Sequence, residues 1–466
     1  MNQQKDIIRD ARVLGTPKML LLGLQHMFAM FGATILVPIL VNSYFQSTSQ
    51  VLSVQVTLFC AGFGTLFFHL CTKFKVPAFL GSSFAFLGGF SSVAALDTGI
   101  FANMADKEKL QYACGGIVVA GLLYLILALI IRCVGVKRVM RFLPPVVTGP
   151  IIICIGLSLA PSAVSNASTN WLIAIVALAV IIIFNIWGKG MFKIIPILLG
   201  VVISYVFALV LQGLGFTNPD GSVILNFSGV SSAAVVGLPP FILPKFNLTA
   251  ILIMAPIAIA TMMEHIGDIS AISATVGQNF IEDPGLHRTL IGDGIATSIS
   301  AMIGGPANTT YGENTGVLEL SRVHDPKVVR LAACYAIVLS FIPKVAEIIA
   351  SMPASIIGGV SFILYGMISA IGVRNVVENK VDFTKSRNLI VAAVILVCAL
   401  GLSSDTVSFT IGSAAITLSP LAVASIAGIV LNAVFPGKDY KFDTEDVADA
   451  VNFEKEVKPK EKKQKK

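Results

Sequence analysis

The sequence has little charge for its length. Only 13% of its 466 residues are Asp, Glu, Lys or Arg, whereas 55% are hydrophobic. Soluble globular domains carry about 25% charged residues, so this composition excludes an ordinary soluble domain. A bilayer core of roughly 30 Å is crossed by about 20 apolar residues in a helix. We therefore expect an integral membrane protein built of apolar helices.

The sequence also lacks the motifs of several other protein classes. It has no HExxH, no GxSxG, no DxxD-type metal cluster in its apolar segments and no Walker P-loop. These absences argue against a membrane enzyme and against transport driven by ATP. The seven Cys lie almost wholly in apolar segments and have no metal-ligand spacing, so we expect neither a disulfide framework nor a metal site. No cofactor is expected.

Fourteen windows of the sequence are long and apolar enough to be membrane-spanning helices. They are 18–41, 51–71, 77–96, 110–134, 139–163, 170–187, 194–214, 248–275, 286–304, 308–322, 328–350, 353–373, 387–403 and 412–435. The third, ninth, tenth and thirteenth are the weakest. The N-terminal stretch before them is polar and shows no cleavable signal, so the first helix is expected to remain. The predicted fold class is an all-α polytopic membrane protein.

The positive charges alternate between successive loops. Lys and Arg precede the first window and follow each even-numbered window up to the twelfth, with few exceptions elsewhere. Because positively charged loops stay on the cytoplasmic side, this pattern predicts cytoplasmic N- and C-termini in the cell membrane. The tail KPKEKKQKK is interpreted as solvated, and nucleic-acid binding is not expected from charges on membrane loops.

Two carboxylates interrupt apolar windows. Glu264 lies in IATMMEHIGDIS and Glu313 lies in TTYGENTGV. An acid within a bilayer costs several kcal/mol and therefore marks a functional or paired site. A structural buried pair is the alternative interpretation of these two residues. A channel is disfavoured, because two lone acids do not form a selectivity ring.

The chain contains an internal repeat. LPPVVTGPIIICIGL (143–157) resembles MPASIIGGVSFILYG (352–366), and these segments belong to the fifth and twelfth windows. Each is the fifth helix of a seven-helix half, so two such halves lie in opposite orientations. Inverted repeats with broken helices at the midplane are usual in secondary transporters. The third window of each half carries a polar interruption, FLGSSFAF (79–86) and NTTYGENTG (308–316), where short extended breaks are expected.

Several motifs together resemble the nucleobase–ascorbate transporter family, also called nucleobase:cation symporter-2, and most of all its bacterial uracil permeases. They are QHMFAMFGATILVP (25–38), PAFLGSSFAF (77–86), EHIGD (264–268), DPGLHRT (283–289) and TTYGENTGV (309–317). The resemblance implies proton-coupled uptake of a nucleobase, most naturally uracil, by fourteen helices in two inverted repeats. It also implies a homodimer formed through the gate domain.

The resemblance further implies a division of the chain into a core and a gate domain. The parts are a cytoplasmic N-terminus (1–17), the core domain (18–134 and 248–350), the gate domain (135–214 and 351–435), an extracellular loop (215–247) and a cytoplasmic Lys-rich tail (436–466). The substrate contacts that carry over from the family are Glu264, Glu313, Phe84, Ser83, Tyr311, Gly312, Ala33 and Tyr365. Carboxylates suit this role because they accept hydrogen bonds from the two ring N–H groups of uracil.

One position departs from the family pattern. Where the uracil permeases have a second histidine, this chain has Asp268, one helical turn after Glu264. We expect Asp268, Glu264 and Glu313 to carry the coupling proton, with Na⁺ coupling as the alternative at Asp268. The sequence leaves open whether the base is uracil or xanthine. His26 and His265 are interpreted as packing residues, and Asp293 as either part of the polar core or a local hydrogen-bond acceptor.

Overall fold

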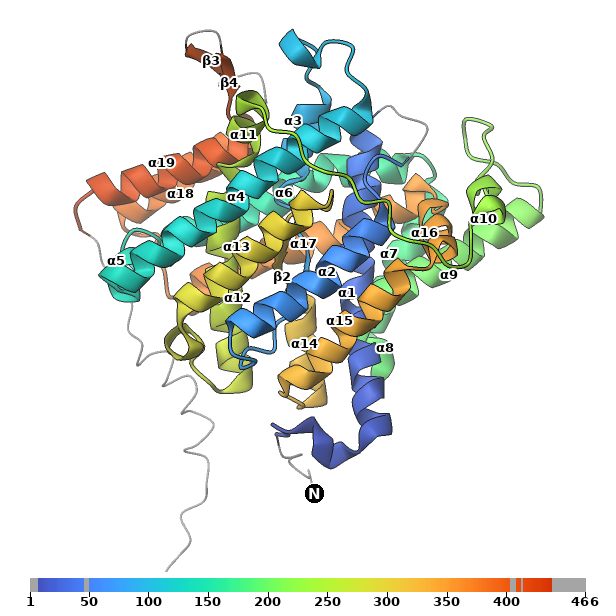
Figure 1. The fold of residues 1–466 in the computed structure, drawn as a ribbon, viewed down its shortest axis with the longest axis horizontal. Helices are drawn as coiled ribbons and strands as arrows, with labels where there is room; N and C mark the ends of the chain where they lie inside the picture. Colours follow the sequence, from blue (N-terminus) through green and yellow to red (C-terminus); the bar gives the residue numbers. More distant parts are fainter. Residues whose placement is uncertain (1–6, 46–49, 403–407, 412–413, 438–466) are drawn as a thin grey trace, which may run out of the picture.

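The computed structural model describes residues 7–45, 50–402, 408–411 and 414–437, and this part of the chain is mostly helical (Figure 1). The first six residues and nearly all of the predicted Lys-rich tail lie outside the described residues. Helices of different lengths cross one another, and short connections join most of them.

Seven helical segments of the described chain are long and apolar enough to cross a membrane, or eight if one bent pair is a single span. The seven are α1 (Thr16–Tyr44), α2 (Val54–Cys71), α4 (Asp106–Val134), α6 (Pro145–Ser168), α9 (Pro196–Gly213), the joined α11 (Leu248–Met254) and α12 (Ile257–Val276), and α17 (Ala354–Glu378). The chain is thus a multi-pass helical membrane protein.

Other helices are shorter. Those of eight to seventeen residues are α3 (Leu87–Ala94), α7 (Trp171–Trp187), α13 (Leu286–Met302), α14 (Gly312–Ser321), α15 (Pro326–Ser340), α16 (Pro343–Ala350), α18 (Ser386–Gly401) and α19 (Pro420–Val434). Those of one or two turns are η1 (Ala11–Leu14), η2 (Gly99–Phe101), α5 (Val136–Met140), α8 (Met191–Ile194), α10 (Ser228–Ser232) and η3 (Ile281–Gly285). Polar side chains begin several of these helices; Ser53 and Asn170, for example, accept a backbone N–H of the first turn.

Two expected windows differ from the structure. Residues 328–350 are not one straight helix, because α15 and α16 meet at 87°. Pro343 begins α16 and cannot continue the preceding helix, since it lacks an N–H and its ring clashes with the previous turn. The last window does not start as helix either. Strand β4 (Ala414–Thr417) pairs with β3 (Ser408–Ile411), and α19 begins only at Pro420; residues 412–413 lie outside the described part.

The two segments of the sequence repeat lie in helices that pack against each other, α6 and α17. A Cβ atom added at Gly156 would lie 2.3 Å from the carbonyl oxygen of Tyr365, and one at Gly372 would lie 2.6 Å from the nitrogen of Ile153. Near the other end, a Cβ at Gly358 would lie 2.2 Å from the nitrogen of Ala167. These contacts follow one another in opposite order along α6 and along α17, so the two helices are antiparallel. Glycine is required because their backbones approach so closely.

The two polar interruptions meet as short strands. β1 (Leu80–Ser82) pairs antiparallel with β2 (Asn308–Thr310), and Gly81 lies opposite Thr309. All six residues are buried. The free edges of this small sheet are satisfied by side chains; Thr65 Oγ1, for example, accepts the N–H of Leu80 at 2.9 Å. Each strand leads into a short helix, β1 toward α3 and β2 toward α14. This crossing positions the candidate site.

Candidate functional site

The candidate site lies where α12 passes the β1–β2 crossing. Ser83 and Phe84 follow β1, whereas Gly312 and Glu313 form the first turn of α14 after β2. Ser83 is 1% exposed and Phe84 7% exposed, and the Ser83 hydroxyl has no hydrogen-bond partner. Residues more than two hundred positions apart in the sequence are thus brought together by one pair of strands.

Helix α12 supplies two carboxylates to this place. Thr310 Oγ1 donates a hydrogen bond to Asp268 Oδ2 at 2.6 Å, which ties α12 directly to β2. Glu264 lies one turn earlier, and its Oε2 is buried without a hydrogen-bond partner. Asp268 and Glu313 are both close enough to Glu264 to interact with its charge. An unpartnered buried carboxylate oxygen is an acceptor that a ligand N–H can satisfy.

The neighbouring glycines have unfilled room beside them. A Cβ atom at Gly267 would meet only Ile152 Cδ1, at 3.9 Å, and one at Gly312 would meet only Ile371 Cδ1, at 3.6 Å. Glu264, Gly267, Gly312 and Glu313 are all partly exposed. The two isoleucines belong to α6 and α17. The room therefore lies between these two helices and the parts of α12 and α14 that carry Glu264 and Glu313.

The first turn of α14 also offers hydrogen-bond donors. The N-terminal residues of a helix have backbone N–H groups without partners inside the helix. Tyr311, which precedes α14, provides no side-chain cap for them. These N–H groups therefore lie beside Glu313, and they can donate to a carbonyl oxygen of a ligand.

The remaining predicted contact residues divide into two groups. The rings of Phe84 and Tyr365 meet edge to face with centroids 6.0 Å apart, and the Tyr365 hydroxyl is buried without a hydrogen-bond partner. Tyr311, in contrast, packs its ring on Gly81 and donates its hydroxyl to the Ser82 carbonyl oxygen at 2.9 Å. Ala33 is fully buried in α1. Ala33 and Tyr311 thus pack within the structure that supports the site.

Two polar pairs beside the site were not predicted from the sequence as pairs. His265 Nδ1 and Asp293 Oδ2 lie 3.0 Å apart, and both side chains are fully buried. Asn314 Nδ2 donates to the carbonyl oxygen of His26 at 3.0 Å and lies 3.2 Å from Nδ1 of the same residue. The sequence signal for the first pair was a histidine and an aspartate that each lie within an apolar segment. The second pair joins α1 to α14, next to Glu313.

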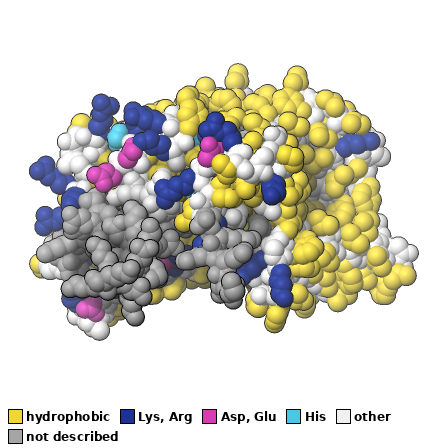
Figure 2. All heavy atoms as spheres, turned by 90° about the horizontal axis from the view of Figure 1, so that it is seen from below, with side chains coloured by type: hydrophobic (Ala, Val, Ile, Leu, Met, Phe, Trp, Pro, Cys, Tyr) yellow, Lys and Arg dark blue, Asp and Glu magenta, His cyan; other side chains and the backbone are white. Residues whose placement is uncertain are grey.

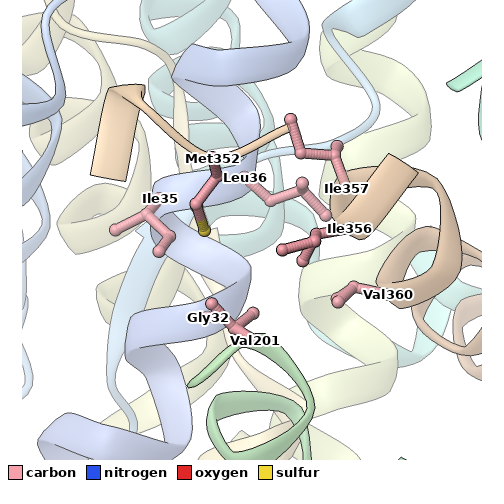
Figure 3. Close-up of a pocket in the computed structure, with 8 residues that line it drawn as sticks. All are labelled: Gly32, Ile35, Leu36, Val201, Met352, Ile356, Ile357 and Val360. Atoms are coloured by element: carbon pink, nitrogen blue, oxygen red, sulfur yellow. The ribbon is translucent and has the colours of Figure 1, made fainter. Parts of the chain in front are cut away.

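A separate small cavity lies between α1, α9 and α17 (Figure 3). Figure 3 shows its apolar lining, with Gly32 and Leu36 from α1, Val201 from α9, and Ile356 and Val360 from α17. Its volume is about 10 Å³. A nucleobase does not fit in a space that holds about one water molecule, and the lining offers no polar partner for water. This cavity is therefore a packing defect between helices and not the candidate site.

Comparison with known proteins decides the family. The Xan_ur_permease model of the permease family matches residues 17–408. The chain belongs to this permease family. The resemblance inferred from the motifs is thereby confirmed, including the expectation of a transport protein.

Individual relatives cover almost the whole chain. A uracil permease of Bacillus subtilis (strain 168) is 41% identical over 442 residues, which is 91% of this chain and 94% of that protein. A uracil permease of Bacillus caldolyticus is 38% identical over 453 residues, 94% of this chain and 96% of that protein. A uracil permease of Escherichia coli (strain K12) is 36% identical and covers 89% of this chain and 90% of its own length.

The fold also has solved counterparts. The transmembrane domain of a cyanobacterium bicarbonate transporter, BicA, superimposes with a TM-score of 0.61 at 16% identity, covering 91% of this chain and all of that one. Murine Slc26a9, an anion transporter in the inward-facing state, gives a TM-score of 0.63 at 10% identity, covering 93% and 73% of the two chains. At such identities the likeness concerns the fold alone, and it places this permease among transporters of the same architecture.

Proposed function

We propose that this permease carries uracil into the cell together with a proton. The observation that supports it most directly is the convergence of Glu264, Glu313 and Asp268 on unfilled room at the β1–β2 crossing. The choice of uracil as the substrate is supported by relatives at 36–41% identity that are named uracil permeases.

The site matches the hydrogen-bonding groups of uracil. Uracil is a flat ring with two N–H donors and two carbonyl acceptors. Glu264 and Glu313 accept from the N–H groups, as the unpartnered Oε2 of Glu264 allows. The free N–H groups of the first α14 turn donate to a carbonyl oxygen. The rings of Phe84 and Tyr365 meet edge to face, and this aromatic pair can pack against the flat uracil ring.

The coupling proton is assigned to the same carboxylates. A site with three acids in one buried place cannot hold all of them charged without a large electrostatic cost. Binding of a proton to Asp268, Glu264 or Glu313 lowers this cost and favours the loaded carrier. Asp268 is bound to Thr310 of β2, so a change in its charge acts on the strand that leads to Glu313.

We further propose that the fold consists of fourteen spans in two inverted halves, with core and gate domains divided as the sequence predicts and both termini in the cytoplasm. The antiparallel packing of α6 on α17 and the antiparallel pairing of β1 with β2 support this inversion. In this arrangement Gly267 and Gly312 lie on the core side and Ile152 and Ile371 on the gate side. We propose that two copies associate through the gate domain.

Competition of uptake tests the proposed substrate. Radiolabelled uracil uptake is measured in cells that lack their own permeases, with excess unlabelled uracil, xanthine, guanine or thymine. We expect uracil to compete fully and xanthine weakly. Competition by xanthine at equal or lower concentration than uracil would instead identify a purine permease of the same fold.

A second measurement tests the proposed coupling ion. Uptake is recorded against external pH with and without Na⁺, and a protonophore is added in a parallel sample. We expect concentrative uptake that falls when the proton gradient is collapsed. Uptake that depends on Na⁺ and ignores the proton gradient would assign Asp268 and the Thr310 hydroxyl to a cation site, since Na⁺ prefers oxygen ligands.

A further inference from the structure

The second half of the predicted extracellular loop (215–247) has an apolar surface. Residues 235–246, here called the strap, contain one charged residue and form no helix or strand. In Figure 1 this yellow-green segment runs across the upper half of the molecule from α10 to α11. Its large apolar side chains that are 44–80% exposed are Val235, Val236, Leu238, Phe241, Leu243 and Phe246. An exposed apolar row of this length marks an interaction surface.

The inner side of the strap covers the ends of two short helices. The N–H of Ile242 donates to the carbonyl oxygen of Ile303, directly after α13, at 3.3 Å. The N–H of Gly237 donates to the carbonyl oxygen of Phe341, directly after α15, at 3.0 Å. Gly304 has a φ of +85°, and a Cβ atom there would lie 3.0 Å from the carbonyl oxygen of Ile242. The strap is thus packed closely on irregular backbone that leads toward β2.

The strap crosses α4 well inside the length of that helix. The N–H of Lys245 donates to the carbonyl oxygen of Gln111 at 2.9 Å, and the carbonyl oxygen of Lys245 lies against Gly115. Gly115 is nine residues after Asp106, the first residue of α4, which corresponds to about 13 Å along the helix axis. The Lys245 ammonium group reaches Glu108 in the first turn at 2.6 Å. Because α4 is long and apolar enough to cross a membrane, the strap lies at a depth that lipid reaches.

The backbone of the strap has few N–H groups to satisfy. Three of the nine residues from 237 to 245 are prolines, which carry no N–H. Four of the other six donate to a carbonyl oxygen, namely Gly237, Phe241, Ile242 and Lys245. Free N–H groups are costly next to lipid, whereas a loop in water is under no such constraint. The pattern therefore points to an apolar environment on the outer side of the strap.

The apolar surface continues from the strap onto neighbouring helices. The ring of Phe241 meets Phe59 of α2 edge to face with centroids 5.2 Å apart, and Phe59 stacks on Phe63 at 6.0 Å. Phe63, Met302 of α13 and Val338 of α15 are exposed beside it. Seen from below, Lys and Arg side chains occupy the left half and the middle of the molecule, whereas hydrophobic side chains line its upper and right edges (Figure 2). The strap thus extends an apolar side of the molecule.

We propose that the strap lies in the membrane interface, with Val236, Leu238 and Leu243 packed among lipid acyl chains of the leaflet on the predicted extracellular side. Its inner side covers the ends of α13 and α15, so it separates their irregular backbone from lipid. A second copy of the chain is a poorer occupant of this surface. The strap contacts α2, α4 and the ends of α13 and α15, all in the predicted core domain, whereas the proposed dimer forms through the gate domain.

Tryptophan fluorescence in lipid vesicles tests this placement. The native Trp residues are removed by Trp171→Phe and Trp187→Phe, and a single Trp is introduced by Leu238→Trp or Leu243→Trp. Each full-length variant is reconstituted into phosphatidylcholine vesicles with or without bromine atoms on the acyl chains. Bromine quenches Trp from the lipid side, and iodide added to the buffer quenches it from the water side. Uracil binding shows that each variant is folded.

Two further variants are the matched controls. Val223→Trp lies in the same loop, is 63% exposed and follows the polar turn at Asn218 and Ser222. Leu129→Trp lies on α4 and is 61% exposed. We expect the two strap variants to lose most of their fluorescence in brominated vesicles, as Leu129→Trp does, and to resist iodide. Val223→Trp should show the opposite behaviour.

Two results would overturn the proposal. Quenching of both strap variants by iodide and not by bromine would place the strap in water, and quenching by neither would mean that protein, such as a second copy, covers it. The unaltered protein provides an independent measurement that needs no folded variant. A phosphatidylcholine with a photoactivatable diazirine on its acyl chain should label peptides from 235–246 and not those from 216–224. Strap peptides without label would contradict lipid contact.

Discussion

Glu264 differs from the paired surface acids of the chain in what surrounds it. Several surface acids of the described chain are paired with a cation, as Glu108 is with Lys245. Glu264 has instead a buried oxygen without a partner, beside open room. A purely structural pair of acids would be expected to satisfy its own oxygens, because buried unpaired groups are costly. This contrast favours a ligand-binding role for Glu264, and Glu313 stands beside the same room, next to Gly312.

We predict that Glu264→Gln and Glu313→Gln each weaken uracil binding by about tenfold to a hundredfold, as expected for a lost charge-assisted hydrogen bond. The amide keeps the size of the side chain but replaces an acceptor oxygen with a donor NH₂ group. Binding to purified protein is measured by calorimetry, and membrane abundance is measured in parallel. Near-normal affinity in both variants would show that the substrate binds elsewhere.

A second prediction concerns Asp268. Asp268→Asn should preserve uracil binding better than concentrative uptake, because an amide oxygen still accepts the hydrogen bond from Thr310 but the side chain cannot release a proton. Asp268→His should restore part of the proton-driven uptake, with its pH dependence moved toward the imidazole range near about 6.5. Uptake and binding are measured on the same preparations across pH. An unchanged pH profile in the Asn variant would leave coupling to Glu264 and Glu313 alone.

The carboxylates could be singled out from the sequence because an acid within an apolar run is visible without any structure. The partners could not. Thr310 and Asp268 are 42 residues apart and meet only because β2 passes α12. The contact of His265 with Asp293 depends in the same way on how α12 lies beside α13. The sequence also did not distinguish Tyr311, which packs on Gly81, from the residues that face open room. The assignment of substrate binding stays a prediction for Glu264, Glu313, Phe84, Ser83, Tyr311, Gly312, Ala33 and Tyr365.

At the scale of elements, glycine serves two different purposes in this chain. Gly156 allows α6 and α17 to touch, since a Cβ there would lie 2.3 Å from the Tyr365 carbonyl oxygen. Gly312 begins α14 and has only Ile371 Cδ1 near it, at 3.6 Å. The sequence does not distinguish Gly156 from Gly312, because a small residue in an apolar window is equally compatible with close helix packing and with a ligand approaching the backbone. The distance to the neighbouring helix, which only the structure gives, distinguishes the two roles.

This difference gives a matched pair of substitutions. Gly312→Val should lower uracil binding while leaving protein abundance near normal, because the side chain has room but intrudes where the ligand approaches. Gly156→Val should lower abundance and thermal stability, since overpacking at a helix contact costs about 1–3 kcal/mol. Fluorescence-detected size exclusion on heated membranes measures stability, and uracil binding is measured on the surviving fraction. The same loss of abundance in both variants would mean that Gly312 is also a packing residue.

The bends of the helices were less visible in the sequence than the helices themselves. The apolar window 328–350 covers both α15 and α16, but a continuous apolar run alone predicts a single straight helix. Pro343 marks the break, and its effect on direction depends on the elements that the two halves pack against. The strand pair β3–β4 was missed for a related reason: a short apolar run before α19 is compatible with either helix or strand.

At the scale of the whole molecule, the proposed mechanism requires α12 and α14 to move relative to α6 and α17. The room at Gly267 and Gly312 lies at the boundary of these two sets of helices, and Ile152 and Ile371 form its other wall. A site at such a boundary can open to either side when one set moves past the other.

We therefore predict that a cross-link across this boundary stops transport. Cysteines at positions 267 and 152 are joined by a short thiol reagent in a background without native cysteines; a Cβ atom built on Gly267 lies 3.9 Å from Ile152 Cδ1. Uptake should fall to background and recover when a reducible cross-link is cleaved, because the two sets of helices can no longer separate. The control joins Val118 in α4 to Ser298 in α13, where the Ser298 hydroxyl donates to the Val118 carbonyl oxygen at 3.0 Å. Both helices belong to the predicted core domain, so this cross-link should leave uptake intact. Normal transport with Gly267 and Ile152 joined would rule out relative movement at this boundary.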